Sequence, residues 1–123
     1  MNAIGKCCWV IADGYLPAWE SGPKPEMESH EAVCILNTGG VDAQVELMLY
    51  FEDRDPVGPY KIRVPAQRTV HQRTNDLTDP QRVPENLGYS CVVTSDQPIV
   101  VQHTRLDSRQ SENALMSTIA YPV

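Results

Sequence analysis

Alternation of apolar and polar residues is the feature that most restricts the fold of this chain. Between Gln44 and Phe51 every second side chain is apolar, starting at Val45, and Tyr60–Val64 repeats the pattern. Period-two alternation places the apolar residues on one face of an extended strand, and it is not the pattern of an amphipathic helix. The 10 prolines favour the same interpretation because proline interrupts helices and occurs often in turns. These patterns predict an all-β chain.

Turn residues separate the strand-like runs at short intervals. The predicted strands are Cys8–Ala12, Glu31–Asn37, Gln44–Phe51, Tyr60–Val64, Arg68–Arg73, Tyr89–Ser95, Ile99–Thr104 and Leu115–Tyr121. The letters SDQP predict a hairpin turn between the sixth and seventh of these strands. Asn75 or Asp76 is expected to cap a short turn of helix. We therefore expect an antiparallel β-sandwich or jelly roll of about eight strands, with residues 1–123 forming a single domain.

The formal net charge of −6 argues against a protein that coats DNA or anionic lipid by bulk attraction. No segment approaches the roughly 20 apolar residues that a membrane-spanning helix needs. The N-terminal apolar run Cys7–Ala12 is short and ends at Asp13, so it lacks the length and flanking residues of a signal peptide. We therefore expect a soluble, cytoplasmic protein.

Cysteine and histidine spacing points away from disulfides, metals and catalysis. None of the four cysteines forms a CxxC pair, and Cys34 and Cys91 lie in apolar runs, so both are expected to be small buried hydrophobes. His30, His71 and His103 have no second ligand at metal-binding spacing. The chain lacks a GxSxG nucleophile motif and a phosphate-binding glycine loop. We expect no cofactor and no enzymatic activity.

A basic stripe extends over the fourth and fifth predicted strands. Between Val57 and Asn75 the chain has no acidic residue, but it has His71 and four basic residues, which are Lys61, Arg63, Arg68 and Arg73. One interpretation is a solvated sheet face balanced by Glu46, Glu52 or Asp55 across the strands. The other is a contact surface for an anion, nucleic acid or protein partner.

The segment VVQHTRLDSRQSEN, residues 100–113, starts as a buried strand and becomes polar. In an extended backbone His103, Arg105 and Asp107 share one side, and Arg109 follows four residues after Arg105. Arginine suits fixed pairing with carboxylates. The segment is consistent with internal salt bridges, with a subunit interface or with a ligand site. Arg105→Ala is expected to weaken the assembly or local fold more than Lys61→Ala.

A small-ligand site is a further hypothesis. Trp19 lies in a proline-rich loop, where an exposed indole can stack on a sugar or anchor a partner, or can instead pack on its own prolines. The polar and stacking candidates for such a site are Trp19, His30, His71, Arg73, His103 and Arg105.

Four long motifs resemble one known family. CWVIADGYLP, SHEAVCILNTG, DPVGPYKIRVPAQRTVHQRTNDL and PIVVQHTRLDSRQSENALMSTIAY occur in the order found in the sensory rhodopsin transducer family of cyanobacteria, and the resemblance extends over roughly Cys8–Tyr121. It implies a compact β-sandwich and a soluble homotetramer with cyclic symmetry, with no catalytic residue.

The same resemblance implies a role in signalling. The namesake of the family relays light signals from a membrane photoreceptor and has been linked to DNA, and a sugar-binding role has been suggested for its relatives. A tetramer of acidic chains is better suited to the Lys/Arg-rich cytoplasmic loops of a membrane protein than to DNA. We therefore expect a signalling module that docks a membrane rhodopsin, with sugar-like ligand binding and DNA binding as alternatives.

Overall fold

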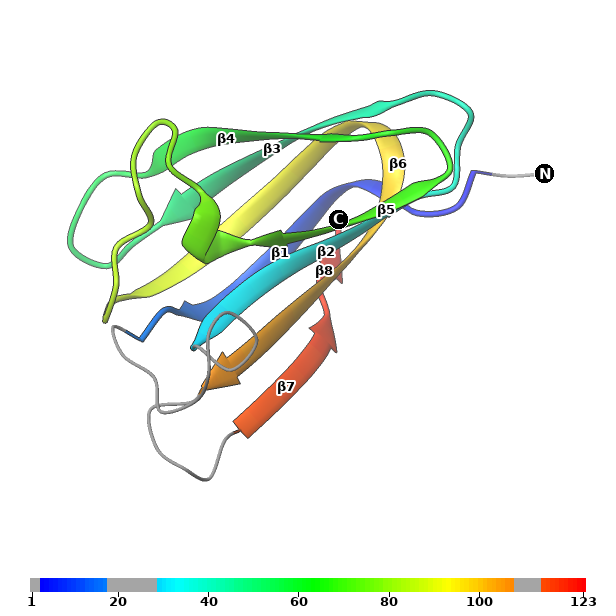
Figure 1. Ribbon diagram of the computed structural model, residues 1–123. Coiled ribbons are helices and arrows are strands. Elements are labelled where there is room, and N and C mark those ends of the chain that lie inside the picture. Colours follow the sequence, from blue (N-terminus) through cyan, green and yellow to red (C-terminus); the bar gives the residue numbers. More distant parts are fainter. Residues whose placement is uncertain (1–2, 18–28, 108–113) are drawn as a thin grey trace.

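The described part of the chain folds mainly into β-strands. A computed structural model describes residues 3–17, 29–107 and 114–123. Its elements are β1 (Lys6–Tyr15), β2 (His30–Asn37), β3 (Ala43–Tyr50), β4 (Val57–Val64), β5 (Arg68–Arg73), the short 3-10 helix η1 (Thr74–Asp76), β6 (Gly88–Asp107), β7 (Ala114–Ile119) and β8 (Tyr121–Pro122) (Figure 1). All strand pairs are antiparallel, which confirms the predicted all-β class.

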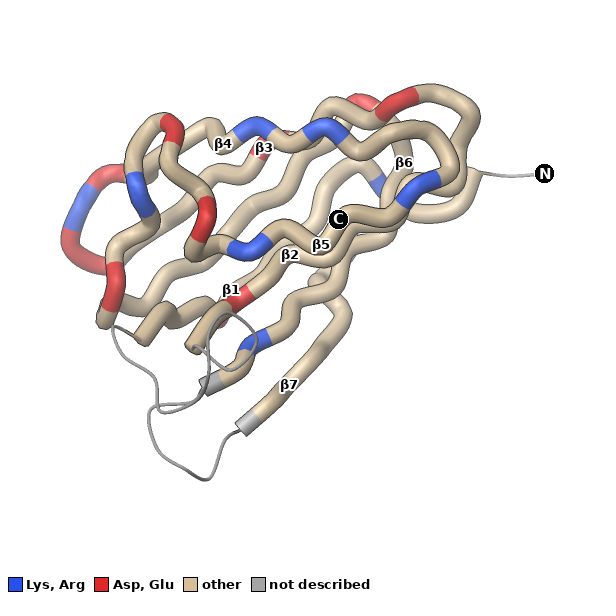
Figure 2. Tube along the Cα trace, in the orientation of Figure 1, with Lys and Arg blue, Asp and Glu red and all other residues tan. Residues whose placement is uncertain are grey.

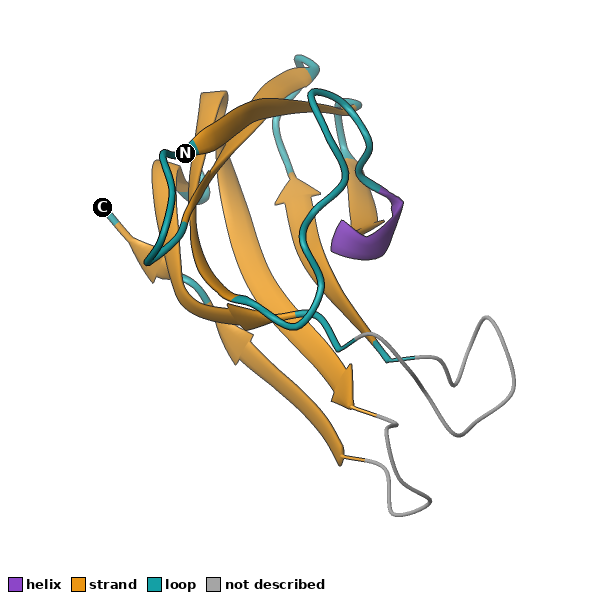
Figure 3. Cartoon of the chain, turned by 90° about the vertical axis from the view of Figure 1, so that its left-hand side faces the viewer, coloured by secondary structure: helices purple, strands orange, loops and turns teal. Residues whose placement is uncertain are grey.

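The strands form two layers that share β6. One layer has the order β4-β3-β6-β1-β8 and uses the first half of β6. In the other layer, the second half of β6 lies between β2 and β7, and β5 pairs with the far side of β2. Figure 3 shows the layers facing each other, with the long strands curving from one toward the other.

The predicted hairpin at SDQP is wrong. β6 runs without interruption for 20 residues, and its two halves pair with different strands rather than with each other. The half up to Ser95 pairs with β1 and β3, Ile99 still pairs with Lys6 of β1, and the half from Val100 onward pairs with β2 and β7. Asp96 and Pro98 therefore mark the corner at which one strand passes between sheets, as happens in sandwiches whose strands switch layers.

The core lies between the two layers and follows the alternation of the sequence. In β3 the side chains of Val45, Leu47 and Leu49 are buried and those between them point outward. Trp9 is also buried, and its Nε1 donates hydrogen bonds to the carbonyls of Lys6 and Ile99, each at 3.0 Å. Other core residues are Ile11, Val33, Ile35, Tyr60, Ile62, Val64, Val93, Ile99 and Val101.

Two local expectations need correction. The expected turn of helix exists as η1, but neither Asn75 nor Asp76 caps it: the N-cap position is Arg73, without a side-chain cap, and Asn75 bonds instead to β2. Cys91 is buried as expected, whereas Cys34 is only half-buried and contacts His71. All four cysteines are free. Among the described residues, no helix has the length and hydrophobicity needed to cross a membrane.

Candidate functional site

A buried carboxylate lies at one end of the sandwich. Glu31 is the second residue of β2, and its side chain is fully inaccessible to solvent. It points inward because it has the same strand parity as Val33 and Ile35, which belong to the core. A charged group in such a place needs opposite charge and hydrogen bonds to offset its lost hydration.

Three donors satisfy this carboxylate from three segments of the chain. The backbone N–H of Tyr15 in β1 donates to Oε1 at 2.9 Å, and the hydroxyl of Tyr89 donates to the same oxygen at 2.5 Å. The Nε of Arg105, near the end of β6, donates to Oε2 at 2.7 Å. Tyr15 and Tyr89 belong to one layer and Glu31 and Arg105 to the other, so these bonds join the two layers.

His103 is the fourth neighbour of Glu31. Its ring is buried, with 2% of the side chain exposed, and Nε2 lies 3.2 Å from Oε2 of Glu31. Nε2 is close to the carboxylate but makes no hydrogen bond of good geometry in the described part of the chain. Arg105 and Tyr89 therefore hold the carboxylate in place, and His103 fills the remaining side. We call Glu31, Tyr89, His103 and Arg105 the Glu31 cluster.

The backbone register of β2 and β6 already places the residues of the cluster close together. Glu31 lies directly opposite Arg105 in the β2–β6 ladder, and Val33 lies opposite His103. Glu31 is also fixed by its backbone: its N–H donates to Oδ1 of Asn75 at 3.2 Å, and its carbonyl accepts from Oγ1 of Thr74 at 3.2 Å. These two hydrogen bonds with η1 fix the backbone at the start of β2.

Arg105 contacts a second acidic residue in addition to Glu31. Its Nη2 donates to the backbone carbonyl of Asp13 at 3.2 Å and lies 3.7 Å from Oδ1 of the same residue. The Asp13 carboxylate is 86% exposed, so this second ion pair is screened by water and adds little. The buried pair with Glu31 is the stronger interaction.

The cluster keeps Glu31 ionised. Burial alone would raise the pKa of this carboxyl, but the contacts from His103, Tyr89 and Arg105 outweigh it and hold the pKa below the ordinary value of 4.5. Burial and the neighbouring Glu31 charge raise the pKa of Tyr89 well above 10.0, so its hydroxyl remains a donor. Both oxygens of Glu31 are occupied and shielded from solvent, so this carboxylate is a structural anchor rather than an accessible general base.

An open groove of about 370 Å³ adjoins the cluster between β1 and β7. Its polar lining residues are Asp13, His103 and Thr118. Its apolar lining residues are Val10, Ile11, Ala12, Met116, Ile119, Ala120 and Tyr121. The volume is within the range of small-molecule pockets, roughly 300–1,000 Å³.

Comparison with known proteins identifies the family. The family model described as Anabaena sensory rhodopsin transducer matches residues 4–122. The chain belongs to this family. A solved structure titled "Anabaena sensory rhodopsin transducer" is 55% identical, with a TM-score of 0.78, and the match covers 90% of this chain and 96% of that one.

A second solved structure shares the fold at greater sequence distance. It is titled "Crystal Structure of Thermotoga maritima 1070", is 33% identical and has a TM-score of 0.85. The match covers all of this chain and 97% of that one. No match was found among curated proteins. The resemblance to the transducer family seen in the sequence is therefore confirmed.

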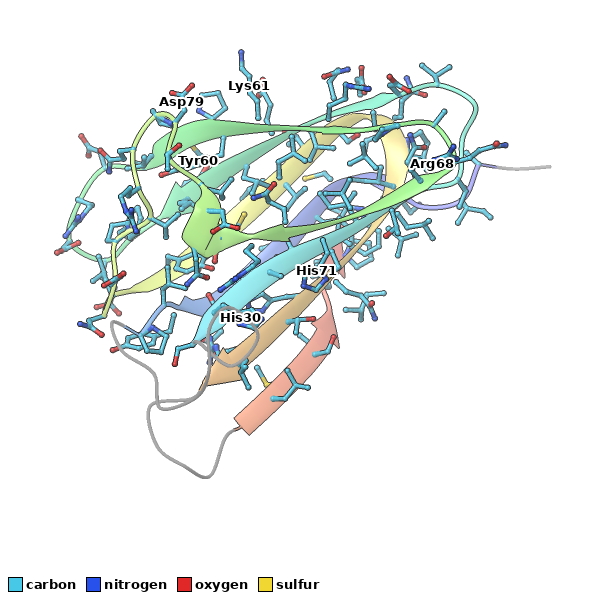
Figure 4. All side chains as sticks on the ribbon, in the orientation of Figure 1. His30, Tyr60, Lys61, Arg68, His71 and Asp79 are labelled. Atoms are coloured by element: carbon cyan, nitrogen blue, oxygen red, sulfur yellow. The ribbon has the colours of Figure 1, made fainter. Side chains whose placement is uncertain are left out.

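In the described part of this transducer-family chain, two of the candidate site residues, His103 and Arg105, meet at Glu31. Trp19 and Arg109 lie outside the described residues, and so does the side chain of Asp107, whose backbone ends β6. His30, His71 and Arg73 lie on the strands of the β5–β2–β6–β7 layer. His30 directly precedes Glu31 in β2, and Arg73 pairs with Ala32, but both positions have the opposite strand parity to Glu31 and therefore belong to the other face of the layer. Figure 4 shows His30 and His71 separated along that layer.

The predicted basic stripe is divided between the layers. Lys61 and Arg63 lie on the outer face of β4, where Lys61 is opposite Glu46 and Arg63 lies 3.3 Å from Asp42. Arg68 and Arg73 lie at the two ends of β5 in the other layer. Figure 4 shows Lys61 projecting from β4 and Arg68 at the far end of the molecule. Balance by Glu46 was expected, whereas the Asp42 pair was not.

The residues missed in the sequence are Glu31, Tyr89, Asp13 and Tyr15. Strand parity contains a signal for Glu31, because a charged residue at the inward positions of EAVCILN must have a buried partner. His103 and Arg105 stand at the same inward parity as Val101. Tyr89 and the backbone of Tyr15 carry no comparable signal, because their roles depend on how the layers meet.

Proposed function

We propose that this protein is a single-domain, non-enzymatic, cytoplasmic signalling protein that docks a membrane photoreceptor and relays its change of state. Membership of the transducer family, with 55% identity to a protein titled as a sensory rhodopsin transducer, is the observation that carries this proposal. The buried and fully satisfied Glu31 is in keeping with a binding protein rather than an enzyme.

Charge supports a basic partner. Acidic residues gather on the β3–β4 loop and on the segment between β5 and β6, at the end of the sandwich opposite the N-terminus (Figure 2). These exposed residues, here called the acidic end, are Glu52, Asp53, Asp55, Asp76, Asp79 and Glu85. The same segments contain only two basic residues, Arg54 and Arg82. Cytoplasmic loops of membrane proteins are rich in Lys and Arg, so the acidic end is the surface we propose for docking.

The test is calorimetric titration of the protein with a sensory rhodopsin from the same genome in detergent micelles. Wild-type protein is expected to bind. Asp55→Lys is expected to weaken binding by about tenfold at low salt, because the introduced positive charge repels a basic partner. Glu46→Lys is the matched control, since it makes the same charge change on the outer face of β3. The absence of any rhodopsin gene, or wild-type protein that does not bind, would refute the proposal.

Exposed apolar residues support a homo-oligomer, which we propose to be a tetramer. Leu115 and Ile119 of the edge strand β7 are 72% and 60% exposed, and the adjacent Tyr121 is 71% exposed. Apolar side chains that gather on an edge strand favour contact with another protein surface. A second copy of this chain would cover them.

A sugar-like small ligand is the second candidate function, and the groove beside His103 favours it. Tyr121 offers a stacking surface there, while Asp13 and Thr118 offer hydrogen-bonding groups. A thermal-shift screen of monosaccharides is expected to give a hit that Tyr121→Ala removes, and a screen without hits would eliminate this function. DNA binding receives less support, because the basic stripe is divided and partly neutralised.

A further inference from the structure

A thiol and an imidazole face each other on the outer side of the β5–β2–β6–β7 layer. Cys34 of β2 and His71 of β5 are directly opposite in the strand register, and Sγ of Cys34 lies 3.1 Å from Nδ1 of His71. Oγ1 of Thr104 lies 3.8 Å from the same sulfur. His71 is exposed and Cys34 is half-buried, so the pair is open to small molecules in solvent.

The other three cysteines lack this arrangement. Cys91 is 1% exposed, and burial raises the pKa of its thiol to about 12, so it is neither accessible nor readily ionised. Cys7 is exposed and Cys8 half-exposed on β1. In the described part of the chain, Cys34 is the one cysteine within hydrogen-bonding distance of an imidazole.

We propose that Cys34 is an oxidative modification site, with His71 as its proton acceptor and hydrogen peroxide as the class of oxidant. The Sγ–H proton passes to Nδ1 of His71, and the sulfur attacks one oxygen of the peroxide. The S–O bond forms as the O–O bond breaks, and the departing hydroxide takes the proton from His71 to become water. Cys34 is oxidised by two electrons to sulfenic acid, and the peroxide is reduced.

The position of Cys34 determines what becomes of the product. Cys7 and Cys8 of β1 and Cys91 of β6 belong to the other layer of the sandwich. No second cysteine of the chain is therefore placed to condense with an oxidised Cys34, and the sulfenic acid is left available for trapping. The site lies on β2 three residues from Glu31 but on the opposite face, so its oxidation changes the outer surface rather than the buried cluster.

The experiment is a peroxide titration followed by dimedone trapping and peptide mass spectrometry. Cys34 is expected to reach half-labelling at a peroxide dose about tenfold lower than Cys7, which is exposed but has no imidazole partner among the described residues. His71→Asn is expected to raise the Cys34 dose to that of Cys7. His30→Asn is the matched control on the same layer and is expected to leave the Cys34 dose unchanged.

Two results would overturn the proposal. One is equal labelling of Cys34 and Cys7 in the wild-type protein, and this comparison stands even when His71→Asn fails to fold. The other is folded His71→Asn protein, verified by its melting curve, in which Cys34 is labelled at the wild-type dose. Neither result depends on whether the protein docks a photoreceptor.

Discussion

At the residue scale, the Glu31 carboxylate determines how the end of the sandwich is held. This carboxylate has no exposed surface, and its buried negative charge is stabilised by donors from β1 and from both halves of β6. Breaking a buried ion pair by removing one partner costs more than the pair contributes, because the remaining charge stays buried. The cluster is therefore sensitive to single substitutions that would be harmless on the surface.

Arg105→Ala tests this dependence. Because Arg105 supplies the charge opposite Glu31, we expect its removal to lower the free energy of unfolding by about 3–5 kcal/mol. Lys61→Ala, on the outer face of β4, is expected to leave the melting temperature unchanged. Denaturant unfolding monitored by tryptophan fluorescence measures both variants. Equal stability of the two variants would contradict the role of Arg105.

The lowered pKa of Glu31 predicts how stability changes with pH. A carboxyl whose pKa is lower in the folded state contributes stability above its unfolded value, near 4.5, and loses it as the pH falls through the folded value. The groups facing it are Tyr89, His103, Arg105 and, further out, Asp13. Glu31→Gln removes this titration, so we expect the variant to be less stable at neutral pH and to lose less stability below pH 4.5.

Urea unfolding between pH 7 and pH 3 measures this difference. Glu46→Gln is the control, because it changes an exposed carboxylate on β3 and should keep the wild-type pH slope. A Glu31→Gln variant with the full wild-type slope would show that other carboxylates cause the acid sensitivity.

At the element scale, the alternation of apolar residues correctly predicted the strands, whereas the turn-forming residues at SDQP wrongly predicted a hairpin. The alternation around Val45–Leu49 correctly predicts a half-buried strand, and the β5 prediction has the observed bounds, Arg68–Arg73. The hairpin at SDQP fails because Asp96 and Pro98 suit a corner as well as a turn. Only the pairing of each half of β6 with strands distant in sequence distinguishes the two, and local sequence does not contain that information.

Gly14 tests the packing of β1 on β6 at this scale. A Cβ at Gly14 would overlap the ring of Tyr89, which in turn donates to Glu31. We expect Gly14→Ala to lower the free energy of unfolding by about 1–3 kcal/mol, the usual cost of overpacking. Gly40→Ala is the control because nothing lies within 4 Å of its added Cβ, and its stability should be unchanged or slightly higher. Thermal unfolding by circular dichroism compares them, and equal melting temperatures would refute the predicted clash.

At the scale of the whole molecule, charge and apolar surface lie on different regions. The acidic end lies on the β3–β4 loop and the segment after β5, whereas four of the exposed large apolar side chains gather on β7 and β8, namely Leu115, Met116, Ile119 and Tyr121. An oligomer built through β7 would leave the acidic end of every copy available to a basic partner. Assembly and docking can therefore be tested separately.

Ile119→Lys tests the proposed assembly. The substitution places a charge on the exposed edge strand, so we expect it to dissociate the oligomer, while wild-type protein has a mass of about four times the 13.7 kDa chain. Val41→Lys is a matched control, because Val41 is also 60% exposed but lies in the turn between β2 and β3. Light scattering coupled to size-exclusion chromatography gives the mass of each variant. A monomeric wild-type protein, or an Ile119→Lys variant with the wild-type mass, would exclude β7 as the interface.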